Sequence, residues 1–399
     1  MPDPGSERRR PLDADVAVVG VGAMGSMALW HLASEGLRVI GLEQHEPLGH
    51  ERGAAGGRTR IFRVAYKEGA WYVPLLQRAS SMWEQLSETT GTRLLLRSGA
   101  LTIGAPEHPD VAEVLRSARE FDLPHEVLDH DQLAARHPQH RLHADDTGVI
   151  DPQGGLLFPS TAIRAAAGLA RDLGATVRTG VRCTAIEEAG DQVRVHTSDG
   201  VVRAGRVLVC GGPWTADLVP GVHGRYEVRR VVLHWFRATE PAAFAPERFP
   251  VGLRRSGPEA DLSFFPPAGD GLVKVNLHVP KETVPELSAF DATVPAAYSR
   301  RIEAAVGELF TGLEPRAADA RAFVEGYTPD GHGLIGAPPG LRRIVTMSGF
   351  SGHGFKLSPV LASLAVDQLL ERGGPALPSR LALARAASGP AHTQTGRTA

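Results

Sequence analysis

Cysteine is scarce in this sequence, in which Cys183 and Cys210 are the only two among 399 residues. So few cysteines argue against a disulfide framework and a cysteine-based metal site, and we predict no metal centre. No apolar run reaches the roughly 20 residues that a membrane span needs. The N-terminal "MPDPGSERRRPL" lacks the apolar core of a signal peptide. A formal net charge of −2 gives no reason to expect a nucleic-acid or membrane partner. We therefore expect a cytoplasmic protein.

The chain is long enough for two domains, and its texture changes along its length. Alternating β and α patterns occur in the N-terminal half: strands at 15–20, 38–43, 192–198 and 201–212, with helices at 23–36, from about 71, and at 161–174. From about residue 226, "YEVRRVVLHWFRAT" and "GLVKVNLHV" predict antiparallel strands with proline-rich connections. Helical patterns return at 299–310 and 359–374, the latter ending at Gly373 and Gly374.

This order predicts a mixed α/β and α+β fold, with a Rossmann-like dinucleotide-binding domain interrupted by a mostly antiparallel substrate domain. We assign 14–94, 152–225 and 324–385 to the dinucleotide-binding domain, and 95–151 and 226–323 to the substrate domain. The polar ends, 1–13 and 386–399, are predicted to be disordered.

A G-x-G-x-x-G motif at Gly20, Gly22 and Gly25 follows the first strand and opens a helix. The first glycine permits the tight turn, the second lets the backbone approach a pyrophosphate, and the third allows close helix–strand packing. The helix N-terminus favours the phosphates, and Glu43 at the end of the second strand is placed to bind ribose hydroxyls. The motif predicts a dinucleotide but leaves both NAD and FAD open.

Three further stretches narrow the choice: "GGRTRIFRVAYKEG" (56–69), "VLVCGGPWTADL" (207–218) and "GFSGHGFK" (349–356). Together they resemble the D-amino-acid-oxidase-type flavoproteins, in the branch of monomeric sarcosine oxidase and N-methyltryptophan oxidase. The resemblance extends from about residue 14 to 370. It implies that the dinucleotide is FAD and that the chain oxidises a CH–NH bond, a carbon–nitrogen single bond with a hydrogen on each atom. The residues expected at the cofactor are Gly20, Gly22, Ala23, Met24, Gly25, Glu43, Gln44, Thr59, Arg60, Val181, Gly211, Gly212, Trp214, Gly349, Phe350, Gly352, His353, Gly354, Phe355 and Lys356.

In proteins of this kind the glycine-rich loop at 349–354 passes along the flavin ring, and the next helix points its N-terminus at the ring's pyrimidine end. A side chain in the loop would hold the backbone away from the ring. The alternative is a plain turn before a helix.

The resemblance also assigns roles to basic residues. Arg63 and Lys356 would anchor the substrate carboxylate, although an arginine is usually a solvated surface residue. Lys274 would favour electron transfer to oxygen on the flavin face opposite the substrate; its alternative is a strand lysine facing solvent. His278, on the same strand face, matches an active-site histidine or is hydrogen bonded without a catalytic role.

Two positions depart from the family pattern. Where the sarcosine-oxidase branch tethers its flavin through a cysteine, this chain has Phe323, so we predict non-covalent FAD. Cys183 and Cys210 are expected to pack in the dinucleotide-binding domain. Glu325 stands where the family has a tyrosine. It would accept a second cationic group or act as a base, or it is a loop residue facing water.

Other substitutions point to a changed substrate. Ser263 replaces a family tyrosine, and "AAG" at 54–56 replaces polar residues. We therefore expect an oxidase of a secondary-amine, N-methyl or cyclic amino acid with a carboxylate, giving an imine and hydrogen peroxide from O2, and a monomer. The alternatives are a dehydrogenase that passes electrons to a carrier, a flavin-binding protein without turnover and, from the glycine motif alone, an NAD-dependent dehydrogenase.

Overall fold

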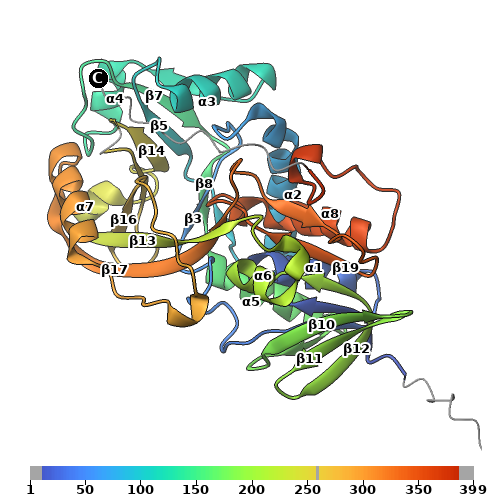
Figure 1. Ribbon diagram of the computed structural model, residues 1–399. Helices are drawn as coiled ribbons and strands as arrows, with labels where there is room; N and C mark the ends of the chain where they lie inside the picture. The colour runs from blue at the N-terminus through green and yellow to red at the C-terminus, as the bar shows by residue number, and fades with distance from the viewer. Residues whose placement is uncertain (1–10, 258–259, 386–399) are drawn as a thin grey trace, which may run out of the picture.

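The structure, a computed structural model, describes residues 11–257 and 260–385 (Figure 1). The disordered tails predicted at 1–13 and 386–399 lie outside the described residues apart from residues 11–13, where the amide of Asp13 donates to the carbonyl of Arg203 at 2.9 Å. No helix in the described ranges is long and apolar enough to cross a membrane.

The fold has two large sheets, which Figure 1 shows at opposite ends of the molecule. The first sheet has the order β10-β11-β12-β1-β2-β9, with β19 also paired to β12 and β18 to β19. Its strands β1, β2, β9, β12 and β19 pair in parallel. The bounds are β1 (Ala14–Val19), β2 (Val39–Leu42), β9 (Thr176–Arg178), β10 (Cys183–Ala189), β11 (Gln192–Thr197), β12 (Gly200–Val209), β18 (Leu334–Gly336) and β19 (Ile344–Ser348).

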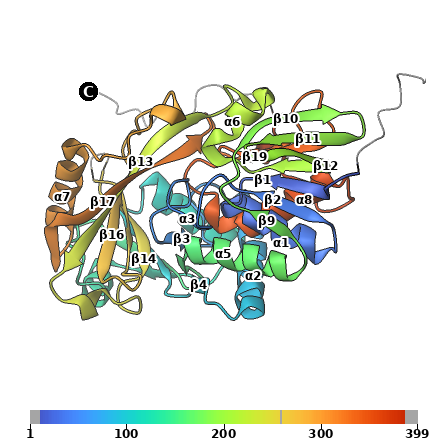
Figure 2. The same cartoon turned by 90° about the horizontal axis from the view of Figure 1, so that it is seen from below.

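Helices α1 (Ala23–Ser34), α2 (Val73–Thr90), α5 (Pro159–Asp172) and α8 (Ser358–Leu369) form the layer against this sheet (Figure 2). Their apolar sides and the buried side chains of β1 make one hydrophobic core. The expected β1–α1–β2 unit is present, and α1 begins directly after the glycine turn. This arrangement fixes the turn between β1 and α1 at the carboxyl edge of the parallel strands, where such sheets bind ligands.

The second sheet is mostly antiparallel, with the order β17-β13-β16-β15-β14-β5-β7-β6. Its strands are β5 (Ala100–Gly104), β6 (Glu126–Leu128), β7 (Thr147–Asp151), β13 (Glu227–Ala238), β14 (Val251–Arg255), β15 (Leu262–Phe265), β16 (Leu272–Leu277) and β17 (Leu313–Tyr327). Helix α7 (Ala296–Leu309) packs on it, as Figure 1 shows at the outer side of β13 and β17. A small third sheet joins β3 (Arg60–Phe62), β8 (Gly155–Leu157) and β4 (Leu95–Leu96).

The remaining elements are short or lie at the edges. Helices α3 (Pro109–Glu120), α4 (His130–Arg136) and α6 (Thr215–Leu218) complete the set, together with 3-10 turns η1 (Ala70–Tyr72), η2 (Gly212–Trp214), η3 (Pro220–Val222), η4 (Pro241–Phe244), η5 (Leu287–Ala289), η6 (Phe355–Leu357) and η7 (Ser379–Leu381).

The fold class is as predicted, whereas the domain boundaries stay predictions. Strands from both predicted substrate-domain ranges share the second sheet, and β17 crosses the boundary drawn between 323 and 324.

The predicted end of α8 at Gly373 and Gly374 is wrong. The helix ends at Leu369, because Glu371 takes a left-handed conformation (φ 55°). The amide of Arg372 then donates to the carbonyl of Asp367 at 2.9 Å, which closes the helix as a C-terminal glycine usually does.

Candidate active site

A long cavity opens at the carboxyl edge of β1 and β2. The predicted cofactor residues that line it are Gly20, Gly22, Ala23, Met24, Glu43, Gln44, Arg60, Val181, Gly211, Gly212, Trp214, Gly349, Phe350, Gly352, Gly354 and Phe355. We call it the cofactor cavity. Of the other predicted cofactor residues, His353 and Lys356 line a second cavity, whereas Gly25 and Thr59 line neither.

The glycine motif fits a dinucleotide at this edge. A Cβ atom at Gly20, where φ is +89°, would lie 2.5 Å from the carbonyl oxygen of Cys210, and one at Gly25 would lie 1.8 Å from the carbonyl oxygen of Gly20. These two glycines therefore serve the turn and the helix packing, as predicted. A Cβ at Gly22 would meet nothing within 4 Å. Its backbone borders open space in the cofactor cavity, as the approach of a pyrophosphate requires.

Glu43 follows β2 and is held in place within the cofactor cavity. Its oxygens accept from the amides of Val21 at 2.9 Å and His45 at 3.0 Å, and His50 Nε2 lies 3.2 Å away. Burial opposes ionisation, but the contact with His50 and the amide bonds lower the pKa of Glu43. An ionised carboxylate is the acceptor that ribose hydroxyls require.

The glycine-rich loop at 349–354 has steric reasons for its glycines within the protein itself. A Cβ at Gly349 (φ +64°) would lie 2.8 Å from Thr328 Cγ2, and one at Gly354 would lie 2.5 Å from Phe350 Cβ. Gly352 has φ +85°, and Ser351, which lies between Gly349 and Gly352, is also left-handed at +52°. The expectation that the loop needs glycine to lie near the flavin ring is therefore incomplete, because the turn and its packing already require it.

The second cavity meets the cofactor cavity at Arg60, Glu325 and Gly352, which line both. We call it the substrate cavity. All five residues predicted to be catalytic line it, although they come from distant segments of the chain: Arg63, Lys274, His278, Glu325 and Lys356.

Arg63 follows β3 and is 4% exposed. Its Nη2 donates to both carboxylate oxygens of Glu68 at 2.9 Å, whereas its Nε and Nη1 have no partner among the described residues. Burial disfavours the charge, but Glu68 beside it raises the pKa of Arg63. Buried N–H donors without a partner are costly, and Nε and Nη1 can each donate to a carboxylate oxygen.

The neighbouring arginines do different work. Arg58 pairs with Asp270 and, at 2.7 Å, with Asp319. Arg60 donates to the carbonyls of Thr59 at 2.9 Å and Ala54 at 2.7 Å. Arg63 therefore differs from Arg58 and Arg60 in having buried nitrogens without a partner among the described residues.

Lys356 is buried in a short hydrogen-bonded chain. Its Nζ donates to Tyr66 Oη at 3.2 Å, and that hydroxyl lies 3.1 Å from Nδ1 of His353. Nε2 of His353 faces the carbonyl of Gly331 at 2.8 Å, which requires the proton on Nε2 and leaves Nδ1 as the acceptor. Burial, partly offset by Glu68, lowers the pKa of Lys356 to about 7.

Lys274 on β16 is 2% exposed, so the alternative of a strand lysine facing solvent is wrong. Its ammonium donates to the carbonyls of Thr59 at 2.5 Å and Gly57 at 3.2 Å and lies 3.8 Å from the ring centroid of Phe265. Burial and the charges of Arg60 and Arg58 lower its pKa well below the usual value.

His278 lies just beyond the end of β16, and its Nδ1 accepts from Arg255 Nη1 at 3.1 Å. Burial and the charge of Arg255 lower the pKa of His278 well below the usual value. A neutral histidine therefore faces the substrate cavity.

Glu325 lies on β17, so the alternative of a loop residue facing water is wrong. One oxygen accepts from the amide of Gly352 at 3.0 Å, and the other lies 3.5 Å from Tyr327 Oη. Burial raises the pKa of Glu325, and the charges of Arg60 and Lys281 partly offset this. The carboxylate stands where the two cavities join.

Phe323 lies two residues earlier on β17 and lines neither cavity. A Cβ on Gly56 would lie 2.2 Å from its ring, which also belongs to a buried cluster with Leu233 and Trp235. Cys183 and Cys210 both line the cofactor cavity, which their expected packing role did not include. Burial raises the pKa of both thiols, to about 11 for Cys183.

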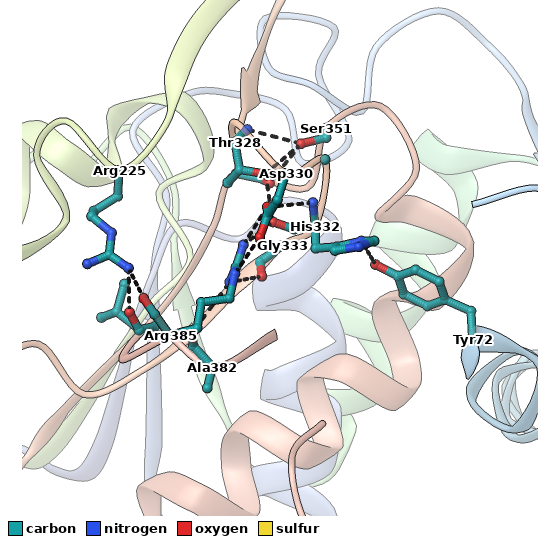
Figure 3. A network of polar contacts seen from close by, with 12 residues as sticks. Tyr72, Arg225, Thr328, Asp330, His332, Gly333, Ser351, Ala382 and Arg385 are labelled. Carbon is teal, nitrogen blue, oxygen red and sulfur yellow. Dashed lines mark hydrogen bonds and ion pairs between the residues drawn. The ribbon is translucent and has the colours of Figure 1, made fainter. Parts of the chain in front are cut away.

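A polar network supports the glycine-rich loop from behind (Figure 3). Arg385 donates to both oxygens of Asp330, at 2.7 and 2.9 Å, and to the carbonyls of His332 and Gly333. The backbone amide of the adjoining Thr328 donates to Oγ of Ser351 in the loop at 3.1 Å. This network fixes the C-terminal segment to the loop.

Sequence reasoning missed several side chains that complete the site. Glu68 and Tyr66 stand within the quoted 56–69 stretch, so their place beside Arg63 was readable from it. Lys281 lacked such a signal, because the fold alone brings it to Glu325. His50 and Tyr327 lie close in sequence to Glu43 and Glu325, but no motif pointed to them.

Comparison with known proteins agrees with this geometry. The profile of the family described as FAD dependent oxidoreductase matches residues 15–368. The chain is 33% identical over 359 residues to a monomeric sarcosine oxidase of Streptomyces avermitilis, covering 89% of this chain and 93% of that protein. It is 30% identical over 361 residues to an N-methyl-L-tryptophan oxidase of Citrobacter koseri, covering 88% and 94%.

Among solved structures, the fold is similar to the open form of NikD, an unusual amino acid oxidase essential for nikkomycin biosynthesis. The TM-score is 0.83 at 23% identity, over 93% of this chain and 98% of that one. A glycine oxidase from Geobacillus kaustophilus gives 0.76 at 20% identity, over 94% and 99%.

Proposed function

This chain belongs to the family of FAD-dependent oxidoreductases, in which it is an amine or amino-acid oxidase related to sarcosine oxidase, and from that premise we propose that it oxidises a secondary-amine amino acid at the expense of dioxygen. The observation that carries the proposal is that Arg63 lines the substrate cavity with two buried nitrogens, Nε and Nη1, that have no partner among the described residues. The cavity adjoins the one that fits the dinucleotide.

In the proposed reaction the substrate loses a hydride from its α or N-methyl carbon and a proton from nitrogen, leaving a C=N bond. FAD held in the cofactor cavity would supply the two-electron chemistry, by which the hydride and the proton reach dioxygen as hydrogen peroxide. Water then hydrolyses the imine to a carbonyl compound and an amine.

The residues of this chain hold the substrate. Arg63 and Lys356 bind its carboxylate, and the chain from Lys356 through Tyr66 to His353 fixes the direction of the ammonium. Glu325 accepts the substrate's N–H where the two cavities join. His278, neutral and held by Arg255, borders the same space without a charge.

Two carbonyls hold the amino group of Lys274, and in its protonated form its charge favours the reduction of dioxygen. This role favours oxygen over a carrier protein as the electron acceptor.

FAD is held without a covalent bond in this proposal, because a phenylalanine replaces the tethering cysteine at 323. The contacts that retain FAD are then those of the glycine turn, Glu43 and the glycine-rich loop. Acid precipitation of the purified protein tests this: the yellow colour should move to the supernatant, and colour that stays in the pellet would contradict it. A cytoplasmic location and a monomeric state stay predictions from the sequence.

The activity is tested by following oxygen uptake and peroxide release with a panel of N-methyl amino acids. We expect one peroxide for each oxygen consumed. Turnover only with an artificial dye, and none with oxygen, would favour the dehydrogenase alternative.

A further inference from the structure

The ladder between β13 and β16 stops partway along the two strands. It ends at the pair His234–Val275, where the amide of His234 donates to the side chain of Asn276 at 3.2 Å. The two segments come together again where the amide of Arg230 donates to the carbonyl of Glu282 at 2.8 Å. Between these points the backbones are apart.

We call this gap the sheet opening. Most residues that border it line the substrate cavity: Val231, Val232 and Leu233 from β13, with Leu277, His278, Val279 and Lys281 from the end of β16 and the segment after it. The cavity therefore occupies the gap.

The sheet opening is reached from both faces of the second sheet. Successive side chains of a strand point to opposite faces. Leu233 faces the loop that carries Arg60, since its Cδ1 lies 2.3 Å from where a Cβ of Gly57 would be. His234 faces α7, since its Nε2 lies 3.3 Å from Ser299 Oγ. Because both line the substrate cavity, the cavity passes through the sheet.

The two ends of this passage differ in chemistry. The acidic residues among the described lining, Glu68 and Glu325, both stand on the side of Arg63 and Lys356. The walls of the sheet opening are mainly aliphatic, and Ile302 of α7 continues them.

The far end is bordered by Tyr298 and Arg301 of α7 and by Arg230, whose Nε pairs with Glu282 at 3.0 Å. An aliphatic passage that ends at a hydroxyl and arginines suits a flexible chain with an anionic end.

We propose that the sheet opening receives the substrate's side chain, and that the substrate is a secondary-amine amino acid whose long, unbranched side chain ends in a carboxylate near Tyr298 and Arg301. The inference rests on the proposed function, because Arg63 and Lys356 fix the α-carboxylate from which the side chain departs. It adds a specificity that neither a sarcosine-sized substrate nor an aromatic one would need.

The test compares kcat/KM for N-methylglycine, N-methyl-L-norleucine and N-methyl-L-2-aminoadipate. The kcat/KM for N-methyl-L-norleucine should exceed that for N-methylglycine by at least about tenfold, since a methylene in an apolar pocket is worth about that factor or more. The kcat/KM for N-methyl-L-2-aminoadipate should be about tenfold higher again. Arg301→Met should remove this second gain without changing kcat/KM for N-methyl-L-norleucine. A preference for N-methylglycine, or equal values for all three, would overturn the inference and leave the proposed function standing. Failure of all three to reduce the flavin would overturn both.

A plug variant tests the location. Val279→Trp should abolish the advantage of the long chains, so that the kcat/KM ratio of N-methyl-L-norleucine to N-methylglycine falls to about one. Val127→Trp, on β6 at a valine that is 45% exposed, is the matched control and should change nothing. If Val279→Trp slows all three substrates equally, the passage is an entry route. If the variant slows only the reaction of the reduced enzyme with oxygen, the passage is an oxygen route. Either result overturns the inference.

Discussion

Arg63 and Glu68 offer the sharpest test of carboxylate binding, because Arg63 is buried, Glu68 is only partly exposed, and Nε and Nη1 of Arg63 have no partner among the described residues. Replacing Arg63 alone would leave Glu68 with only the longer contact to Lys67, at 3.6 Å, and would confuse folding with binding. The double variant Arg63→Gln/Glu68→Gln removes both charges and keeps the volume. Loss of one partner of a buried, charge-assisted contact costs about 2–5 kcal/mol. At about 1.36 kcal/mol per factor of ten, kcat/KM should fall by about 30-fold to about 5,000-fold.

The assay compares an N-methyl amino acid with its uncharged amide. The wild type should prefer the acid strongly, and the double variant should lose that preference while its slow rate on the amide is retained. Arg58→Gln is the control, since Arg58 pairs with Asp270 and Asp319 and lines neither cavity. A double variant that loses less than about threefold on the acid, or loses equally on acid and amide, would refute the reasoning.

Three further predictions concern the positively charged residues Lys274, Lys356 and Arg385. Lys274→Met should slow the reaction of the reduced enzyme with oxygen by about 10²–10³-fold and leave reduction by substrate within severalfold, as stopped-flow half-reactions would measure. Binding of a carboxylate inhibitor should weaken as the pH rises through about 7, where Lys356 loses its proton, and this dependence should vanish in Lys356→Met. Arg385→Met should lower the free energy of unfolding in urea by about 2 kcal/mol. The contribution should be present above about pH 4 and fade as the pH falls, because Arg385 lowers the pKa of Asp330 in the folded state.

The sequence predicted the first β1–α1–β2 unit because its signals are local. A buried apolar strand, three glycines at fixed spacing and an acid after the next strand stand within 30 residues. Strand β17 gave no comparable signal, since "LEPRAADARAFVEGY" lacks alternation and becomes a strand by pairing with β13. Pairing of β5 with β14, about 150 residues apart in sequence, likewise depends on the whole fold.

The same division applies to the site. Arg63, Tyr66 and Glu68 share one motif, so their proximity could be read from the sequence. The sheet opening could not, because it exists where the ladder between β13 and β16 ends at His234. The steric reasons for glycine in the loop at 349–354 could not be predicted from the sequence either. They depend on the positions of Thr328 and Phe350, whose atoms a side chain there would meet.

The visible spectrum of the purified protein, recorded under anaerobic conditions before and after addition of N-methyl-L-norleucine, tests the central claim most directly. We predict a two-banded flavin spectrum that bleaches with the substrate and returns when air is admitted, with release of hydrogen peroxide. A colourless protein that cannot be reconstituted with FAD, or a flavin that no N-methyl amino acid bleaches, would contradict it.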